Sequence, residues 1–378
     1  MNNLSDNAQL ALDTLHRVPT TGIPIGLVHI MEHSVIEHLA GAVQGSYVKD
    51  PHGVYVRMLE RVGVCMIDQY LAENPLSMAS HGYHAGSQVG APIGAVVCDG
   101  MVIDSPEAVA EHIERFAIPI FQNMTRDFNF AAVETAVVRS EQKDQQRLGA
   151  NILKTGYGQL SFPRLGYTQY GYENYFMAFA LYPDVMGRLF AAHADYYEKH
   201  NRAVVSGFVK AGLPLYHRLD HDMADSRGLL TGLHALEKHW LPCFERAIRP
   251  AVDAGFTLLW HCDGNLMELL PLLLECGLKG FQGFQYEDGM DYVKICAMRD
   301  DLIIEAGVSV TRELPSGMPL DVKRQVDFLV EHGPKTGLFL QFSSSCVPGT
   351  PLANIEAAVE AMQYYRRVGR KDSTIATP

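Results

Sequence analysis

Residues with metal-binding side chains directly follow a strongly apolar stretch of the chain. The apolar run at residues 257–260 ends in His261, Cys262 and Asp263, and Gly264 then breaks the pattern. Imidazole, thiolate and carboxylate groups are the ligands that zinc takes in proteins. The length and composition of the run predict a buried strand that delivers these groups at its carboxyl end. The segment therefore predicts a zinc site at the end of this strand.

A second apolar run offers a further ligand. Residues 337–342 form another predicted strand, which is followed by three serines and Cys346. Alternate side chains of a strand face the same way, so His261 and Asp263 share a face and Cys262 points opposite. The set that fits this geometry is His261, Asp263 and Cys346. The softer set of His261, Cys262 and Cys346 requires a bulge, and both sets stay open.

Two carboxylates after other predicted strands are candidate catalytic groups. Asp222 ends the polar run 220–222, which follows the predicted strand 213–219 and could instead cap the next helix. Glu287 follows the predicted strand 278–284 and could serve as a catalytic group or as an exchanging ligand. If the strands are parallel, both side chains reach the same edge of the sheet as His261.

The segment at residues 162–176 is dense in aromatic side chains. We interpret it as an irregular segment over the mouth of the site, where its tyrosines either pack a lid or contact a substrate. Aromatic rings can bind another ring by stacking or a methylated cation by a cation–π contact. The candidate substrate contacts are Tyr167, Tyr170 and Tyr172.

Strand and helix patterns alternate through the second half of the chain. This alternation predicts a parallel sheet, and several such units in series favour a single (β/α)₈ TIM barrel, an α/β fold. A doubly wound sheet is the alternative, but no G-x-G-x-x-G turn follows a strand. The predicted strands are 213–219, 257–262, 278–284, 302–308 and 337–342, and the predicted helices are 235–254, 266–276, 290–298, 320–332 and 353–368.

The first half is less regular. Its predicted elements are strands at 23–30 and 62–68, a short strand at 94–98, and helices at 107–115 and 184–200. We divide the chain into an N-terminal arm, the barrel and a disordered polar tail. These parts cover residues 1–20, 21–369 and 370–378.

Composition excludes several classes of protein. The formal net charge is −12 and no Lys/Arg block is dense enough to grip phosphates, which argues against nucleic-acid binding. No stretch reaches the ~18 consecutive apolar residues of a spanning helix. The 7 cysteines are scattered without a CxxC pair, and the first residues lack the features of a signal peptide. We therefore expect a cytoplasmic protein without disulfides.

The chain resembles the uroporphyrinogen decarboxylase superfamily and, within it, the branch of cobalamin-dependent methyltransferases. The resemblance is good over residues 170–368 and looser before them. It rests on these motifs: Asp222-Met223-Ala224 with Arg227-Gly228, the run 261–265, Gly289-Met290-Asp291, Gly307-Val308 leading to 314–317, the run 343–346, and 348–351 with Asn354.

The resemblance implies a single (β/α)₈ barrel with a zinc ion held by a His-x-Cys pair and a later cysteine. His261 matches the first ligand and Cys346 the last, but Asp263 stands where the middle cysteine would be, with Cys262 beside it. A harder, oxygen-bearing site suits activation of an ether or alcohol oxygen more than a thiol.

The resemblance also implies a reaction and its partners. We expect zinc-dependent transfer of a methyl group from a small donor, preferably a methoxylated aromatic compound, to cobalt. No D-x-H-x-x-G motif is present, so the cobalamin is expected on a separate corrinoid protein. A methyl-corrinoid:thiol methyltransferase is one alternative. A decarboxylase is another, although residues 29–34 lack the arginine of that family. A homodimer is included among the expected assemblies.

Overall fold

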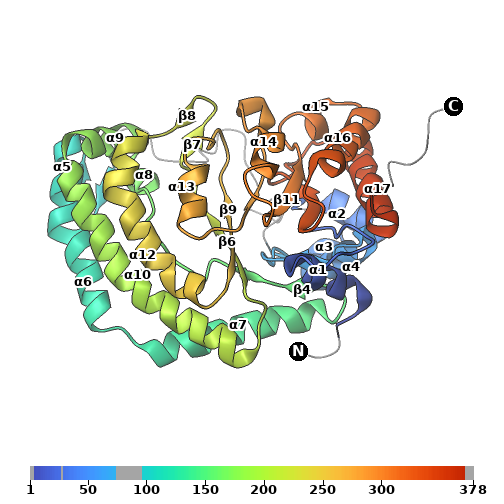
Figure 1. Ribbon diagram of the computed structural model, residues 1–378, viewed down its shortest axis with the longest axis horizontal. Helices are drawn as coiled ribbons and strands as arrows, with labels where there is room; N and C mark the ends of the chain where they lie inside the picture. Colours follow the sequence, from blue (N-terminus) through green and yellow to red (C-terminus); the bar gives the residue numbers. More distant parts are fainter. Residues whose placement is uncertain (1–3, 27–28, 74–95, 371–378) are drawn as a thin grey trace.

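The computed structural model describes residues 4–26, 29–73 and 96–370, and its largest element is a curled, six-stranded parallel sheet (Figure 1). All neighbouring strands pair in parallel. The strands are almost wholly buried, which explains why the sequence reads as continuous apolar runs. Their order is β12 (Leu338–Phe342), β11 (Ile303–Val308), β10 (Gly280–Gln282), β9 (Thr257–His261), β6 (Tyr216–Asp220) and β5 (Gly156–Tyr157).

Helices connect the strands and cover the outer face of the sheet (Figure 1). This arrangement confirms the predicted α/β class and the parallel sheet of the second half. The helices that follow β6, β9, β10, β11 and β12 are, in chain order, α12 (Leu241–Asp253), α13 (Leu270–Glu275), α14 (Tyr292–Cys296), α16 (Pro319–His332) and α17 (Leu352–Val368). Shorter elements between them are β7 (Ala224–Asp225), β8 (Gly228–Leu229), η4 (Tyr286–Asp288) and α15 (Glu313–Ser316).

The N-terminal half contributes short parallel pairings. β1 (Met66–Ile67) pairs with β4 (Leu153–Lys154), which continues almost directly into β5 at the edge of the large sheet. Ile25 forms parallel bridges to Val64 and to Leu340 of β12. The pairing of β1 is shorter than the predicted strand 62–68. Of the predicted strand 23–30, residues 27 and 28 lie outside the described residues, and the described part forms single bridges at Ile25 and Ile30. The complete closed eight-stranded barrel stays a prediction.

Part of the predicted N-terminal arm is a helix, α1 (Asp6–Leu15), that covers one end of the sheet. Its residues Ala8, Ala11 and Leu15 are buried in a small apolar cluster. The cluster includes residues at or near the starts of strands, so α1 lies opposite the carboxyl ends where the candidate ligands emerge. The strand and loop residues of the cluster are Cys65, Met66, Leu153, Tyr216, Leu259, Ile303 and Phe339.

The N-terminal half of the chain contributes further helices. The helix predicted at 184–200 corresponds to α10, which is longer and runs from Pro183 to Ala211. The predicted helix 107–115 is α5 (Pro106–His112), which continues through the π-helical turn η2 (Ile113–Ala117) into α6 (Ile118–Arg126). The remaining helices of this half are α2 (His33–Ala40), α3 (Ser46–Lys49), α4 (Pro51–Val62) and α7 (Phe130–Leu148).

Two predicted segments have a different secondary structure from the one expected. The segment 162–176 is largely helical rather than irregular, because α8 (Tyr167–Tyr170) and α9 (Tyr172–Leu181) meet at Gly171. The predicted helix 235–254 is divided: α11 (Leu233–Ala235) and the π-helical turn η3 (Leu236–Trp240) precede α12.

The predicted strand at 94–98 lies partly outside the described residues. Its described part, β2 (Val96–Cys98), forms an antiparallel hairpin with β3 (Met101–Ile103) and does not join the large sheet. Of the predicted tail, residues 371–378 lie outside the described residues. Within the described part of the chain, no helix is long and apolar enough to cross a membrane.

The close approach of β10 to β11 gives a test of the fold. A Cβ at Gly280 would overlap the backbone oxygen of Ile303, so we expect Gly280→Ala to lower the free energy of unfolding by about 3 kcal/mol. Gly232→Ala is the matched control, since nothing lies within 4 Å of its added Cβ, and we expect a change within ~0.5 kcal/mol. Denaturant unfolding of both variants measures the difference, and equal stabilities would contradict this packing.

Candidate metal centre and adjoining pocket

Three side chains gather at the carboxyl ends of β6 and β9. One potential ligand atom from each of Asp222, His261 and Asp263 lies within 4.8 Å of the other two. His261 is the last residue of β9, and Asp263 follows two residues later on the same face. Asp222 follows β6, the strand that pairs with β9. The group therefore offers one nitrogen and two carboxylates at one point.

The imidazole of His261 is oriented by the next strand. Its Nδ1 lies 3.3 Å from the carbonyl oxygen of Gln282. Because a carbonyl only accepts, Nδ1 donates this hydrogen bond, and in a neutral imidazole the lone pair is then on Nε2. Nε2 lies 3.8 Å from Oδ1 of Asp263. Metal-binding histidines usually have such an outer partner on the second ring nitrogen.

The loop after β9 is fixed by hydrogen bonds to its backbone. Oδ1 of Asp222 accepts from the N–H of Asp263 at 2.9 Å, and Oε1 of Gln285 accepts from the N–H of Gly264 at 2.6 Å. Gly264 has φ +85°, and an added Cβ would lie 2.8 Å from the backbone of Ala224. A glycine is needed at this turn, as the sequence suggested.

The group is strongly acidic. Burial and the neighbouring carboxylates of Asp222, Asp220 and Asp288 raise the pKa of Asp263, while the charge that His261 carries when protonated opposes this rise. Carboxylates gathered in this way repel one another, and a divalent cation would relieve the repulsion. The electrostatics thus suit a metal ion between His261 and the two aspartates.

Neither predicted cysteine ligand belongs to this group. Cys262 points away from His261, as strand alternation predicts, and its sulfur accepts from the N–H of Met223 at 3.3 Å. The thiol of Cys346 lies beside Thr350, and burial raises its pKa to about 11. The structure therefore brings together His261, Asp263 and the candidate catalytic residue Asp222, and does not bring Cys346 to them.

Glu287 also lies elsewhere. Its Oε1 accepts from the hydroxyl of Ser309 at 3.1 Å and from that of Thr311. The side chain is held against the loop after β11, outside the group of three ligands. Gln285, from the same turn, accepts a hydrogen bond from the loop after β9, and the charge of Asp288 acts on Asp263.

The three candidate substrate tyrosines divide into two sets. The hydroxyl of Tyr167 donates to the backbone oxygen of Asp222 at 2.8 Å, and its ring stacks on Tyr172 with centroids 4.7 Å apart. Tyr172 is 44% exposed. Tyr170, by contrast, is buried and bonded to His112 Nδ1 at 3.0 Å, so it belongs to the packing between helices. Tyr167 and Tyr172 thus lie beside the ligand group, and Tyr170 does not.

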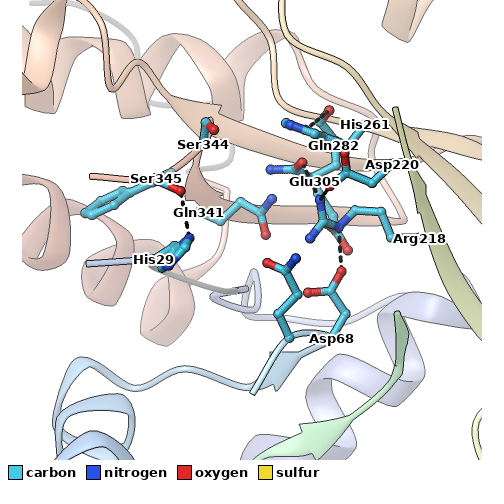
Figure 2. Close-up of a pocket in the computed structure, with 12 residues that line it drawn as sticks. His29, Asp68, Arg218, Asp220, His261, Gln282, Glu305, Gln341, Ser344 and Ser345 are labelled. Carbon is cyan, nitrogen blue, oxygen red and sulfur yellow. Dashed lines mark hydrogen bonds and ion pairs between the residues drawn. The ribbon is translucent and has the colours of Figure 1, made fainter. Parts of the chain in front are cut away.

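A small polar cavity of about 130 Å³ adjoins the ligand group and shares His261 with it. Figure 2 shows side chains from several strands pointing into one space. Most of them are polar residues at or near the carboxyl ends of otherwise apolar strands. The lining residues are His29, Asp68, Gln69, Arg218, Asp220, His261, Gln282, Glu305, Gln341, Phe342, Ser344 and Ser345.

Arg218 is the centre of the pocket's charges. Its Nε contacts a carboxylate oxygen of Asp68, and its Nη1 lies 3.3 Å from Oδ2 of Asp220 and 3.2 Å from Oε1 of Gln282 (Figure 2). Burial opposes the positive charge of Arg218. The surrounding carboxylates outweigh burial and raise its pKa, so the guanidinium stays charged.

Two more buried groups complete the pocket. Burial, reinforced by the negative charge of Asp68, raises the pKa of Glu305 to about 7, and Tyr216 donates a hydrogen bond to its carboxylate. Burial and the charge of Arg218 lower the pKa of His29 to about 4. His29 Nδ1 lies 2.8 Å from the hydroxyl of Ser345. At neutral pH His29 is therefore uncharged.

Sequence reasoning missed this pocket, although a signal was present. Arg218, Glu305 and Gln341 each interrupt a run of buried strand residues, and Gln282 ends another such run. A charged or amide side chain inside a buried strand requires a partner, so such interruptions predict a polar site between strands.

No family model and no curated protein matches this chain. Among solved structures, a methyltransferase from Methanosarcina mazei is similar, with 14% identity and a TM-score of 0.59. The similarity covers 96% of this chain and 99% of that one.

Two other solved structures are less similar. A B12-independent methionine synthase from Shewanella has 10% identity and a TM-score of 0.35, covering 47% of this chain and 56% of that one. A sugar phosphate isomerase/epimerase from Parabacteroides distasonis has 10% identity and a TM-score of 0.37, covering 93% and 98%. The similarity to the Methanosarcina mazei structure shows that this chain shares its overall fold over nearly the whole length of both.

The group of Asp222, His261 and Asp263 leads to a prediction about zinc binding. We expect His261→Ala and Asp263→Asn each to weaken zinc binding by about 100-fold or more, since even outer partners of ligands contribute 10–100-fold. Cys346→Ser should bind zinc like the wild type, because its sulfur lies outside the group. Asp225→Asn, which removes a nearby carboxylate paired with Arg227, is the matched control. Calorimetric titration with zinc measures each affinity, and loss of binding in Cys346→Ser would contradict this ligand set.

Proposed function

We propose that this protein is a metal-dependent methyltransferase. It moves a methyl group from the oxygen of a small methylated donor to the cobalt of a separate corrinoid protein. The observation that carries the proposal is the convergence of Asp222, His261 and Asp263 at the carboxyl ends of β6 and β9. The fold shared with the methyltransferase from Methanosarcina mazei and the sequence resemblance to corrinoid-dependent methyltransferases support it.

The donor atoms fit a zinc ion. Catalytic zinc takes three protein ligands from histidine, cysteine and carboxylate side chains and keeps one position open. Asp222, His261 and Asp263 would hold the ion, and the hydrogen bond from Nδ1 to Gln282 already turns Nε2 of His261 toward Asp263. When bound, the ion would supply Lewis acidity that stabilises negative charge on the leaving oxygen.

The composition of the group favours an oxygen substrate over a thiol. Zinc sites that activate thiols are usually rich in sulfur, whereas this group contains one imidazole and two carboxylates. Asp222 also accepts from the backbone N–H of Asp263, which holds the carboxylate of Asp222 against the loop that carries Asp263. The transfer of methyl from a corrinoid to a thiol is therefore the less favoured direction.

Apart from one proton, the proposed transfer needs no reactant besides the donor and the reduced cobalt. The bond between the methyl carbon and the donor oxygen breaks, and its electron pair stays on the oxygen, which takes up a proton. The methyl carbon forms a bond to the reduced cobalt of the partner, and the cobalt supplies the two electrons of this new bond. Since α1 covers the opposite end of the sheet, the partner approaches from the carboxyl ends of the strands.

The preference for a methoxylated aromatic donor depends on the two tyrosines near Asp222. The ring of Tyr167 already stacks on other aromatic rings, those of His221, Tyr172 and Phe176. The half-exposed ring of Tyr172 is the surface that an aromatic donor could contact. A methoxyarene therefore stays in the panel of donors to be assayed.

A transfer assay tests the proposal. Reduced cobalamin serves as the acceptor, methyl ethers serve as donors, and formation of methylcobalamin is followed by absorbance. We expect His261→Ala to lower the rate by about 100-fold, which corresponds to about 2.7 kcal/mol of barrier. A chelator should produce the same loss and added zinc should reverse it, while Asp225→Asn should keep the wild-type rate.

Two results would count against the proposal. Transfer that is insensitive to chelator and to His261→Ala would remove the metal from the reaction. Demethylation of methylcobalamin that depends on an added thiol, without transfer from any ether, would favour the reverse reaction.

A further inference from the structure

The lining of the polar pocket beside His261 indicates what kind of methyl donor the protein binds. His261 is a lining residue of the pocket and also a member of the ligand group, so a molecule in the pocket lies next to the metal centre. Figure 2 shows the side chains of Arg218, Glu305 and Gln341 directed into this space from β6, β11 and β12. The pocket is therefore the natural place for the part of the donor that does not react.

The charges of the pocket do not balance. Among its described lining residues, Arg218 is the one side chain with a fixed positive charge, while Asp68, Asp220 and Glu305 are carboxylates. Arg218 is already engaged by Asp68 and Asp220. It therefore has little attraction left for an added anion. Carboxylate, sulfonate or phosphate groups of a substrate would meet net negative charge here.

A metal ion in the ligand group leaves this imbalance in place. The ion would compensate Asp222 and Asp263, which are its ligands. Arg218 supplies one positive charge, which Asp68 and Asp220 share. The other donors are neutral: the hydroxyl of Tyr157 donates to Asp220 at 2.8 Å, and that of Tyr216 donates to Glu305. Buried carboxylates without a full countercharge favour a cationic partner.

The size and lining of the pocket limit what it can hold. A cavity of about 130 Å³ has room for a few non-hydrogen atoms. The amides of Gln282 and Gln341 and the hydroxyls of Ser344 and Ser345 offer hydrogen bonds. Phe342 is the one aromatic carbocycle among the described lining residues, so a second ring would gain little by stacking. The lining suits a short polar group better than an arene.

We propose that the methyl donor is a small O-methylated amine whose ammonium group is held by Asp220 and Glu305 while its methoxy oxygen lies at the metal centre beside His261. This inference rests on the proposed function and narrows its donor to one class. It also separates the protein from enzymes that act on anionic substrates, such as carboxylated tetrapyrroles.

Three compounds of matched shape test the charge preference directly. They are 2-methoxyethylammonium, the uncharged 1-methoxypropane and the anion methoxyacetate. Calorimetric titration of the zinc-loaded protein is carried out above the pKa of about 7 of Glu305, so that this carboxylate is ionised. We expect the cation to bind at least about tenfold more tightly than the neutral ether, and the anion to bind most weakly.

Variants then assign the preference to the pocket. Glu305→Gln and Asp220→Asn should each weaken binding of the cation by about tenfold or more and leave binding of 1-methoxypropane unchanged. Asp225→Asn removes a carboxylate outside the pocket and should change neither affinity. If either pocket variant fails to fold, the three ligands on the wild-type protein still decide the question.

The outcomes separate this inference from the proposed function. Equal or tighter binding of 1-methoxypropane or methoxyacetate would overturn the inference. Transfer from methoxybenzene but not from 2-methoxyethylammonium would also overturn it, and would leave the methyltransferase proposal standing. Tight binding of the cation without transfer from any ether would overturn the proposed function and still support a cation-binding pocket.

Discussion

The buried contact of Arg218 with Asp68 and Asp220 is the constraint on which the arrangement of the site depends. Asp68 follows β1 in the N-terminal half, whereas Arg218 and Asp220 belong to β6. Removing such charges from water is costly, and a single missing partner would leave another charge buried and uncompensated. The contact therefore fixes the N-terminal loop against the large sheet at the carboxyl ends of the strands, where the pocket forms.

Two kinds of chemistry meet at His261. On one side its imidazole belongs to a group of nitrogen and carboxylate ligands, and on the other it forms part of the pocket wall. The strands make this possible because β9 lies between β6 and β10 in the sheet. Gln282, at the end of β10, contacts both sites: its backbone oxygen orients His261, and its side chain meets Arg218. Gln282 is thus a direct structural link between the pocket and the ligand group.

Part of this site could be predicted from the sequence. Strand alternation alone places His261 and Asp263 on one face and Cys262 on the other, and the structure has that arrangement. The parallel sheet was predictable because its strands are buried on both faces and read as apolar runs. These features depend on local periodicity, which a single sequence records.

Features that depend on loops were not predictable in the same way. The path of the chain after β12 turns the thiol of Cys346 toward Thr350, and the turn after β10 sends Glu287 to Ser309 and Thr311. No periodic pattern describes such turns. The position of Tyr170 was not predictable for a related reason: an aromatic cluster does not reveal which of its rings face a helix, and His112 lies 58 residues away in sequence.

The similarity to a known structure at 14% identity shows a fold, and the same fold can host different reactions. The reaction must therefore be argued from side chains that the fold does not require. A parallel sheet needs apolar residues at buried strand positions, yet this chain places Arg218, Glu305 and Gln341 there. Arg218 contacts Asp68, Asp220 and Gln282, and Glu305 is hydrogen-bonded to Tyr216 and Gln341. Arg218, Glu305 and Gln341 all line the pocket that adjoins the candidate ligands. Burial of polar groups lowers stability unless they are fully paired, so their concentration at one point is best explained by the binding of a polar substrate.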